Sequence, residues 1–241
     1  MRRDVPDMSL RAQPAELPEL MDEPCSCEDL RACLRDIGRL NEWLRGYRPT
    51  LEWLSQFEDK RAPLRILDVG CGDGETLRRI ARWARKRKID VRLIGLDLNA
   101  ETIGIAKELT SADSGIEFLS VDVFAYEPAV PVDLIVSTLF THHLSDEEIV
   151  RYLRWMERHA RLGWFVNDLS RAEVPYRLLR LFTRAMRLHR IVQHDGPASI
   201  ARAFRRDDWM RYCSAAGLEQ RDYSILSYTP ARLCVSRVKL P

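Results

Sequence analysis

The chain has 241 residues, 46% of them hydrophobic and 31% charged, and a formal net charge of +2. This is enough chain for one sizeable core, and the apolar share is too high for a disordered protein. The longest uncharged stretch near the middle, Leu134 to Ser145, is far shorter than the roughly 20 apolar residues of a membrane-spanning helix. The start of the chain runs into acids and prolines, so we expect no secretory signal and a cytoplasmic protein.

The first 60 residues are expected to precede the main domain. Residues 1–24 hold four prolines among acids, which predicts a poorly ordered arm. In residues 25–60, leucines and isoleucines recur every three or four positions, which predicts an N-terminal helical cap. Six cysteines lack paired zinc-finger spacing and nearby histidines, so we expect free thiols and no metal.

From residue 61 to 241 the predicted elements alternate between strands and helices. Apolar runs predict strands at 64–69, 91–96, 116–121, 133–138 and 164–167, and two late strands at 223–228 and 232–238. Helices are predicted at 75–88, 100–109, 145–160 and 207–216, the third opened by the capping box Ser145 and Glu148. This alternation predicts an α/β fold with a doubly wound, mostly parallel sheet.

The segment 171–206 is longer than a simple connection, so we expect a helical lid over the site. Residues 174–192 show a helical pattern with four arginines on one stripe, and the sequence His194-Asp195-Gly196-Pro197 is expected to interrupt it. The stripe is typical of a solvated helix face. It also fits a helix lying on a membrane surface and serving a lipid-tailed substrate, at the inner face of the membrane. Nucleic-acid binding is not expected, because aromatic residues are not interleaved with the arginines.

A glycine-rich loop follows the first predicted strand, in the sequence Leu67-Asp68-Val69-Gly70-Cys71-Gly72-Asp73-Gly74. Asp97 ends the next strand, where a carboxylate can accept hydrogen bonds from ribose hydroxyls. Dinucleotide sites use G-x-G-x-x-G and hold a pyrophosphate, which the carboxylates around this loop would repel. S-adenosylmethionine (SAM) carries an ammonium and a sulfonium instead, so the local charge favours SAM.

These two stretches resemble the first and second motifs of the class I SAM-dependent methyltransferases, in the small-molecule branch that includes ubiquinone and menaquinone biosynthesis enzymes. The resemblance implies a seven-stranded Rossmann-like sheet ending in an antiparallel hairpin. It implies contacts from Asp68, Gly70 and Gly72 to the methionine part of SAM. It places Asp97 on the ribose, Leu98 against the adenine and Asp122, with Val123, at the adenine amino group. Thr138, at the end of the fourth strand, is expected to line the same site.

The fourth strand is followed by Thr141-His142-His143, at the sheet edge where ligands of doubly wound folds bind. We expect His142 or His143 to lie near the transferred methyl and to act as a base toward a hydroxyl or an acidic carbon. The alternative is that both histidines are structural. The substrate pocket is expected to include Tyr47, Phe140, Tyr176 and Phe204.

The function predicted from the sequence is transfer of the SAM methyl group to an oxygen or carbon of a small phenolic, quinol-like or polyketide-type compound. An RNA or protein methyltransferase and a non-catalytic SAM-binding protein are the alternatives. The sequence leaves the acceptor and the oligomeric state open.

Overall fold

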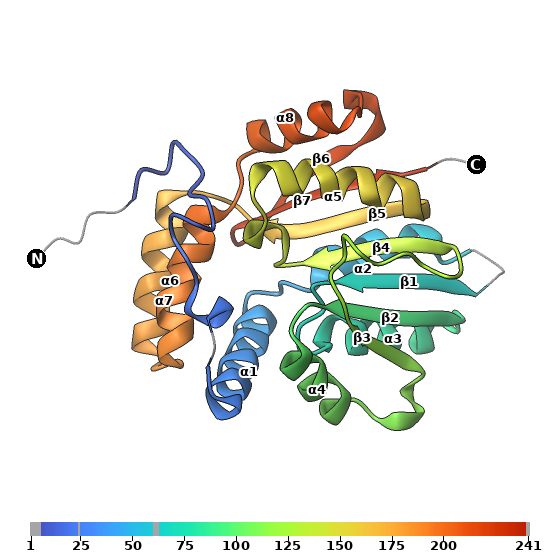
Figure 1. Cartoon of the computed structure of the whole chain (residues 1–241), viewed down its shortest axis with the longest axis horizontal. Helices are drawn as coiled ribbons and strands as arrows, with labels where there is room; N and C mark the ends of the chain where they lie inside the picture. The colour runs from blue at the N-terminus through green and yellow to red at the C-terminus, as the bar shows by residue number, and fades with distance from the viewer. Residues whose placement is uncertain (1–5, 24, 60–62, 240–241) are drawn as a thin grey trace, which may run out of the picture.

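The computed structural model describes residues 6–23, 25–59 and 63–239. They form a seven-stranded sheet in the order β3-β2-β1-β4-β5-β7-β6, with helices on both faces (Figure 1). All neighbouring strands are parallel except β7, which runs antiparallel to β5 and to β6. The predicted doubly wound fold and its terminal hairpin are therefore confirmed.

The strands follow the apolar runs of the sequence closely. Their bounds are β1 Leu64–Val69, β2 Val91–Asp97, β3 Ile116–Ser120, β4 Val132–Thr138, β5 Ala160–Leu169, β6 Ser224–Tyr228 and β7 Arg232–Val238. Every residue of β4 except its last is buried, as expected for a central strand covered by helices on both faces.

Helices cover the sheet in two layers. One face packs on α5 (Asp146–His159) and α8 (Arg206–Ala216), and the other on α2 (Arg48–Leu54), α3 (Glu75–Arg87) and α4 (Ala100–Leu109). Consecutive residues of a strand contribute to opposite layers, as Ile66 and Leu67 of β1 do. The predicted capping box of Ser145 and Glu148 is present at the start of α5.

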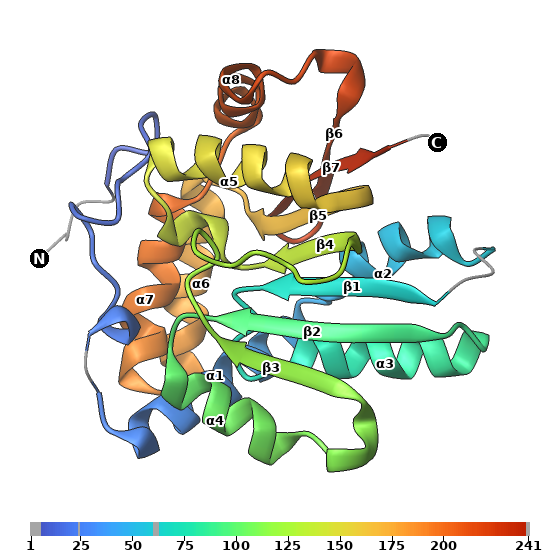
Figure 2. The same cartoon turned by 45° about the vertical axis from the view of Figure 1, so that its right-hand side comes forward.

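Three further helices lie beyond the carboxyl ends of the parallel strands. Figure 2 shows α1 (Cys27–Trp43), α6 (Glu173–Ala185) and α7 (Arg190–Arg202) together at this edge of the sheet. Here a doubly wound fold binds its ligands. Among the described residues, no helix is long and apolar enough to cross a membrane.

The break expected at residues 194–197 was wrong, because these residues lie inside α7. The helix expected over 174–192 is instead divided, since α6 ends at Ala185 and α7 begins at Arg190. Two contacts hold this segment in helical form. The Asp195 carboxylate accepts hydrogen bonds from the backbone N–H groups of Leu20 and Met21 at 2.8 and 3.0 Å. Gly196 packs against Leu179 of α6 so closely that an added Cβ would lie 3.2 Å from it. Tertiary packing therefore outweighs the low helix propensity of glycine and proline.

Residues 6–23 also differ from the expected arm. They form an N-terminal strap that runs along α7 toward the amino end of α1 (Figure 1). Met8 and Glu19 are buried, and Ala12 donates a backbone hydrogen bond to the carbonyl oxygen of Ala201 at 3.2 Å. The acids and prolines suggest solvent exposure, but polar contacts with distant residues order this segment.

Arg11 is the main attachment of the strap. Its guanidinium is buried and donates hydrogen bonds to the carbonyl oxygens of Arg202, at 2.7 Å, and of Leu144, at 2.6 Å. It also pairs with the Asp146 carboxylate at 2.7 Å. One side chain therefore joins the strap to α7, to α5 and to the loop after β4.

We expect Arg11→Ala to lower the free energy of unfolding by about 2–4 kcal/mol, because it leaves two buried carbonyl groups without their donor. Urea denaturation followed by circular dichroism measures the change. Arg177→Ala is the control, because this side chain is 65% exposed and pairs with Glu173 at the surface. Equal stability of the Arg11 variant and the control would contradict the proposed attachment.

Candidate active site

The loop between β1 and α3 depends on its three glycines. Gly70, Gly72 and Gly74 have φ values of 67°, 54° and 78°, in the left-handed region that glycine adopts without strain. At Gly70 an added Cβ would also lie 2.5 Å from the ring of Phe140. Around Gly72 an added Cβ would meet no atom within 4 Å, so the backbone there borders open space that a ligand can approach.

Asp97, at the end of β2, is bonded to this loop. Its carboxylate accepts hydrogen bonds from the backbone N–H groups of Gly72 and Asn99, each at 3.0 Å. Burial raises the pKa of Asp97, although these two N–H groups favour the ionised form. The remaining acceptor positions of the carboxylate border the cavity described below.

Asp68, the residue before the last of β1, has a buried carboxyl group that no hydrogen bond or cation of the described residues stabilises. Neither carboxylate oxygen has a hydrogen-bond partner among the described residues. Burial and the neighbouring charge of Asp97 raise the pKa of Asp68 well above its usual range. Thr138, at the end of β4, likewise has a buried hydroxyl without a partner in the described chain. An ammonium group such as that of SAM fits the Asp68 carboxylate.

The other residues expected around the nucleoside border the same cavity. Leu98 is 75% exposed to it and to solvent, whereas Val123 is buried. Asp122 accepts a hydrogen bond from the backbone N–H of Phe124 at 2.9 Å and so caps the turn that follows β3. Its second oxygen accepts no hydrogen bond from the described residues.

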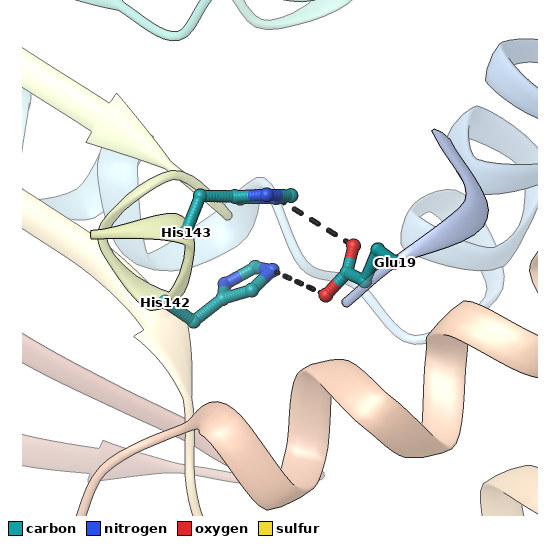
Figure 3. Close-up of side chains that lie close together, drawn as sticks. All are labelled: Glu19, His142 and His143. Atoms are coloured by element: carbon teal, nitrogen blue, oxygen red, sulfur yellow. Dashed lines mark ion pairs between the residues drawn. The ribbon is translucent and has the colours of Figure 1, made fainter. Parts of the chain in front are cut away.

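His142 and His143 lie side by side after β4, with ring centroids 4.4 Å apart. The Nδ1 atom of His142 is 2.7 Å from the Asp168 carboxylate, and that of His143 is 3.3 Å from the Asp22 carboxylate. The Nε2 atoms of both rings face Glu19 of the strap, at 3.7 and 3.8 Å (Figure 3). These side chains therefore form a cluster of donor atoms that could hold a metal ion.

Asp168 sets the orientation of this cluster. It is fully buried at the end of β5 and accepts hydrogen bonds from the Thr141 hydroxyl, at 2.6 Å, and from two backbone N–H groups. Burial opposes its ionisation, but the charge and hydrogen bond of His142 and the Thr141 hydroxyl hold the pKa of Asp168 well below its usual range. An ionised Asp168 accepts the hydrogen bond from Nδ1–H of His142. The Nε2 atom then carries no hydrogen, and its lone pair can accept a proton or bind a metal ion.

A single cavity of about 1320 Å³ joins the glycine loop, the histidine pair and the helices α1, α6 and α7. Its far walls are largely apolar. They include Leu34, Ile37, Leu178, Leu179 and Phe182. The segment 171–206 thus supplies part of the wall through α6 and α7.

Two of the four residues expected in the substrate pocket do border this cavity, namely Tyr47 and Phe140. Phe204 does not, because its ring is fully buried beside Trp209 and Tyr212. Tyr176 does not either. The helical period of α6 turns Pro175, Leu178, Leu179 and Phe182 toward the cavity and directs Tyr176 away from it.

The sequence analysis did not identify Glu19, Asp22 and Asp168 as site residues. The position of Asp168 near the end of the fifth strand was a usable signal, because parallel strands end at one edge of the sheet. No local pattern marks Glu19, which reaches the histidines only through the fold of the strap.

Known proteins share both the local sequence and the architecture. A family model described as a methyltransferase domain matches residues 66–163. Trans-aconitate 2-methyltransferase of Streptomyces avermitilis is 36% identical over 95 residues, which are 37% of this chain and 34% of that protein. The match thus spans about a third of that relative. Ubiquinone biosynthesis O-methyltransferase of Leptothrix cholodnii is 24% identical over 225 residues, 91% of this chain and 88% of that protein.

Solved structures show the same fold at low sequence identity. The plantazolicin methyltransferase BamL, solved with SAH, has a TM-score of 0.66 and 15% identity, covering 91% of this chain and 92% of its own. Magnesium protoporphyrin IX methyltransferase of Synechocystis, solved with SAM, has a TM-score of 0.54 and 12% identity, covering 92% of this chain and 88% of its own. With the glycine loop and the strand order, the match over residues 66–163 identifies a class I SAM-dependent methyltransferase domain in this part of the chain.

Proposed function

We propose that the chain transfers the sulfonium methyl of SAM to an oxygen or carbon of a small phenolic, quinol-like or polyketide-type acceptor. The continuous cavity carries this proposal. Its volume of about 1320 Å³ exceeds the roughly 300–1,000 Å³ of a typical ligand site, so it has room for cofactor and acceptor together. The name of the ubiquinone biosynthesis O-methyltransferase supports a small acceptor.

We assign one end of the cavity to SAM on the basis of the carboxylates that lie there. We assign Asp68 and the backbone at Gly70 and Gly72 to the methionine part of SAM and Asp97 to the ribose hydroxyls. The adenine is assigned to the side of the cavity at Leu98, Asp122 and Val123, with Thr138 beside the methionine part. Thr138 borders the cavity with an unpartnered hydroxyl, and the unpartnered carboxylate of Asp68 lies next in sequence to the cavity-lining residues Val69 and Gly70; both groups support this orientation.

The acceptor end is lined by apolar side chains of α1 and α6, and α6 belongs to the segment 171–206 that we expect to act as a lid. A covered apolar site suits a small molecule better than RNA or a folded protein. None of the four stripe arginines, Arg177, Arg180, Arg184 and Arg187, lines the cavity. A macromolecular substrate would need an open charged surface at the site. A non-catalytic role is disfavoured because the cofactor carboxylates and glycines are all in place.

Methyl transfer is an in-line displacement, and much of its acceleration comes from holding the nucleophile against the methyl group. An acceptor hydroxyl must also lose its proton. The His142–His143 pair borders the cavity and is the group we assign to this activation. The pair can act as a base or as ligands of a metal ion, and only the second role requires Glu19.

We expect Asp68→Asn to weaken SAM binding by about 10- to 100-fold, because a charge-assisted hydrogen bond to the ammonium is lost. The same change should raise the melting temperature of the protein without SAM, because it removes a buried carboxyl group whose ionisation is opposed by burial and by Asp97. Isothermal titration calorimetry and differential scanning fluorimetry measure the two effects. Glu117→Gln, an exposed carboxylate on β3, serves as the control. Unchanged SAM affinity in the Asp68 variant would refute the assignment.

Incubation of the protein with a cell extract and methyl-labelled SAM tests the acceptor class. We expect the label in the organic-soluble fraction, where mass spectrometry identifies the product. Label in protein or RNA would contradict the proposal. The Asp97→Ala variant measures the background, because it lacks the carboxylate assigned to the ribose.

The mouth of the cavity is apolar as well. Leu178 and Leu181 of α6 line the cavity and are nevertheless 61% and 69% exposed. Arg180 and Arg184 lie on α6 and Arg187 lies in the turn after it, and none of the three makes an ion pair within the described residues. Apolar side chains flanked by arginines suit an anionic lipid surface, so we extend the proposal to acceptors with a lipid tail.

Vesicle flotation tests this extension. We expect binding to vesicles containing an anionic phospholipid at low salt, about fivefold weaker for Arg184→Gln, since each basic residue contributes about 1 kcal/mol near such a surface. Arg92→Gln, an exposed arginine on β2, should bind like the wild type. Absence of binding at every salt concentration would refute the lipid-surface contact and leave the methyl-transfer proposal intact.

A further inference from the structure

We propose that Glu19, His142 and His143 bind a divalent transition-metal ion at the wall of the cavity. One ligand atom from each residue lies within 4.8 Å of the other two. All three side chains point toward a common centre in Figure 3. Two imidazoles and one carboxylate form a ligand set used by zinc and by other first-row metals.

The hydrogen bonds of the two imidazoles favour metal binding. In metal sites, a ligating histidine commonly donates its other ring N–H to a carboxylate, which fixes the ring and its tautomer. Here the Nδ1 atom of His142 faces Asp168 at 2.7 Å, and that of His143 faces Asp22 at 3.3 Å. Both Nε2 atoms are therefore directed at the Glu19 carboxylate.

The contacts between these donor atoms are too long for hydrogen bonds. Glu19 lies 3.7 Å from the Nε2 atom of His142 and 3.8 Å from that of His143. The Glu19 Oε1 atom accepts a hydrogen bond from the Ser199 hydroxyl at 2.8 Å, whereas the Oε2 atom has no hydrogen-bond donor in the described part of the chain. An ion between the three groups would bind donor atoms that otherwise face one another without a shared proton.

The charge around the cluster is also suitable. Three carboxylates surround it, those of Glu19, Asp22 and Asp168. Arg202 is the cation in direct contact, with its Nη1 atom 3.4 Å from Glu19 and 3.6 Å from Asp22. Among these four groups, three negative charges and one positive charge leave an excess that a divalent cation neutralises.

The location gives the ion a role that rests on the proposed function. Three protein ligands leave a coordination position open, and Glu19, His142 and His143 all border the cavity. An acceptor hydroxyl bound there would lose its proton to solvent through the half-exposed Asp22 carboxylate. Its oxygen would then form the bond to the methyl carbon while the carbon–sulfur bond breaks, with that electron pair remaining on the sulfur of SAH.

Metal binding is tested on the full chain, without an affinity tag and after dialysis against EDTA. We expect Zn²⁺ to bind with a stoichiometry of one in calorimetry, and Co²⁺ to give the visible absorption of a low-coordinate site. Glu19→Gln and His143→Asn should each weaken Zn²⁺ binding at least ~10-fold, and Asp22→Asn by about 10-fold. His159→Gln, on α5 and paired with Glu127, is the matched control and should bind like the wild type.

Absence of saturable Zn²⁺ and Co²⁺ binding to the wild type would overturn the site, as would equal affinity in the Glu19 and His143 variants. Circular dichroism of each variant shows whether the fold is kept. His143 is 22% exposed and ends a short 3-10 helix (Thr141–His143), so its variant stays informative if Glu19→Gln disturbs the strap. Metal affinity is measured without SAM or acceptor, so this result is independent of whether the proposed methyl transfer is found.

Discussion

The structure depends on how buried carboxylates are compensated at the carboxyl ends of the parallel strands. Asp68 on β1, Asp97 on β2 and Asp168 on β5 all lie at this edge of the sheet. Burying a carboxylate is costly unless hydrogen bonds or a cation stabilise its charge. Asp168 has several donors and Asp97 has two backbone N–H groups, whereas Asp68 has none among the described residues. The unmet charge thus lies at the glycine loop, where the cationic cofactor is expected.

The N-terminal strap adds a second group of charges at the same edge. Arg11 and Arg202 donate hydrogen bonds to the carbonyl oxygen of His142, at 3.3 and 3.0 Å, and so hold the loop that carries the histidine pair. Arg202 also contacts Glu19. The same contacts that order the strap therefore bring its carboxylate to the histidines. The cluster therefore requires the strap to be in place.

Much of the sheet could be predicted because its signals are local. The strand at 64–69 ends at a glycine, and the helix at 100–109 starts after an Asn99 cap that accepts hydrogen bonds from two backbone N–H groups. The last strand, at 232–238, matches its apolar pattern in full. For such elements, the spacing of apolar residues and the capping or glycine residues at the ends are enough to predict type and position.

The strap, the continuity of α7 and the buried position of Phe204 depend on contacts between segments far apart in the chain. The four-residue sequence at 194–197 contains glycine and proline, but Asp195 binds the strap and Gly196 allows α6 to approach. Phe204 is an aromatic residue of the kind found in pockets, but its packing against aromatic residues of α8 buries it away from the cavity. The glycine loop and the carboxylates at the strand ends thus follow from local signals, whereas the positions of Glu19 and Phe204 depend on contacts between distant segments.

The cavity has two chemically different ends, and this constrains any acceptor. Near the histidine pair its wall carries Glu19 and Asp22, whereas toward α1 and α6 it carries leucine, isoleucine and phenylalanine side chains. A uniformly polar molecule would leave the apolar wall unsatisfied, and a pure hydrocarbon would leave the charged wall desolvated without a partner. Under the proposed function, an amphipathic acceptor would satisfy both, with its hydroxyl or reactive carbon at the histidines and its apolar part toward α1 and α6. The exposed Leu178 and Leu181 at the mouth then give a longer apolar tail a route out of the site.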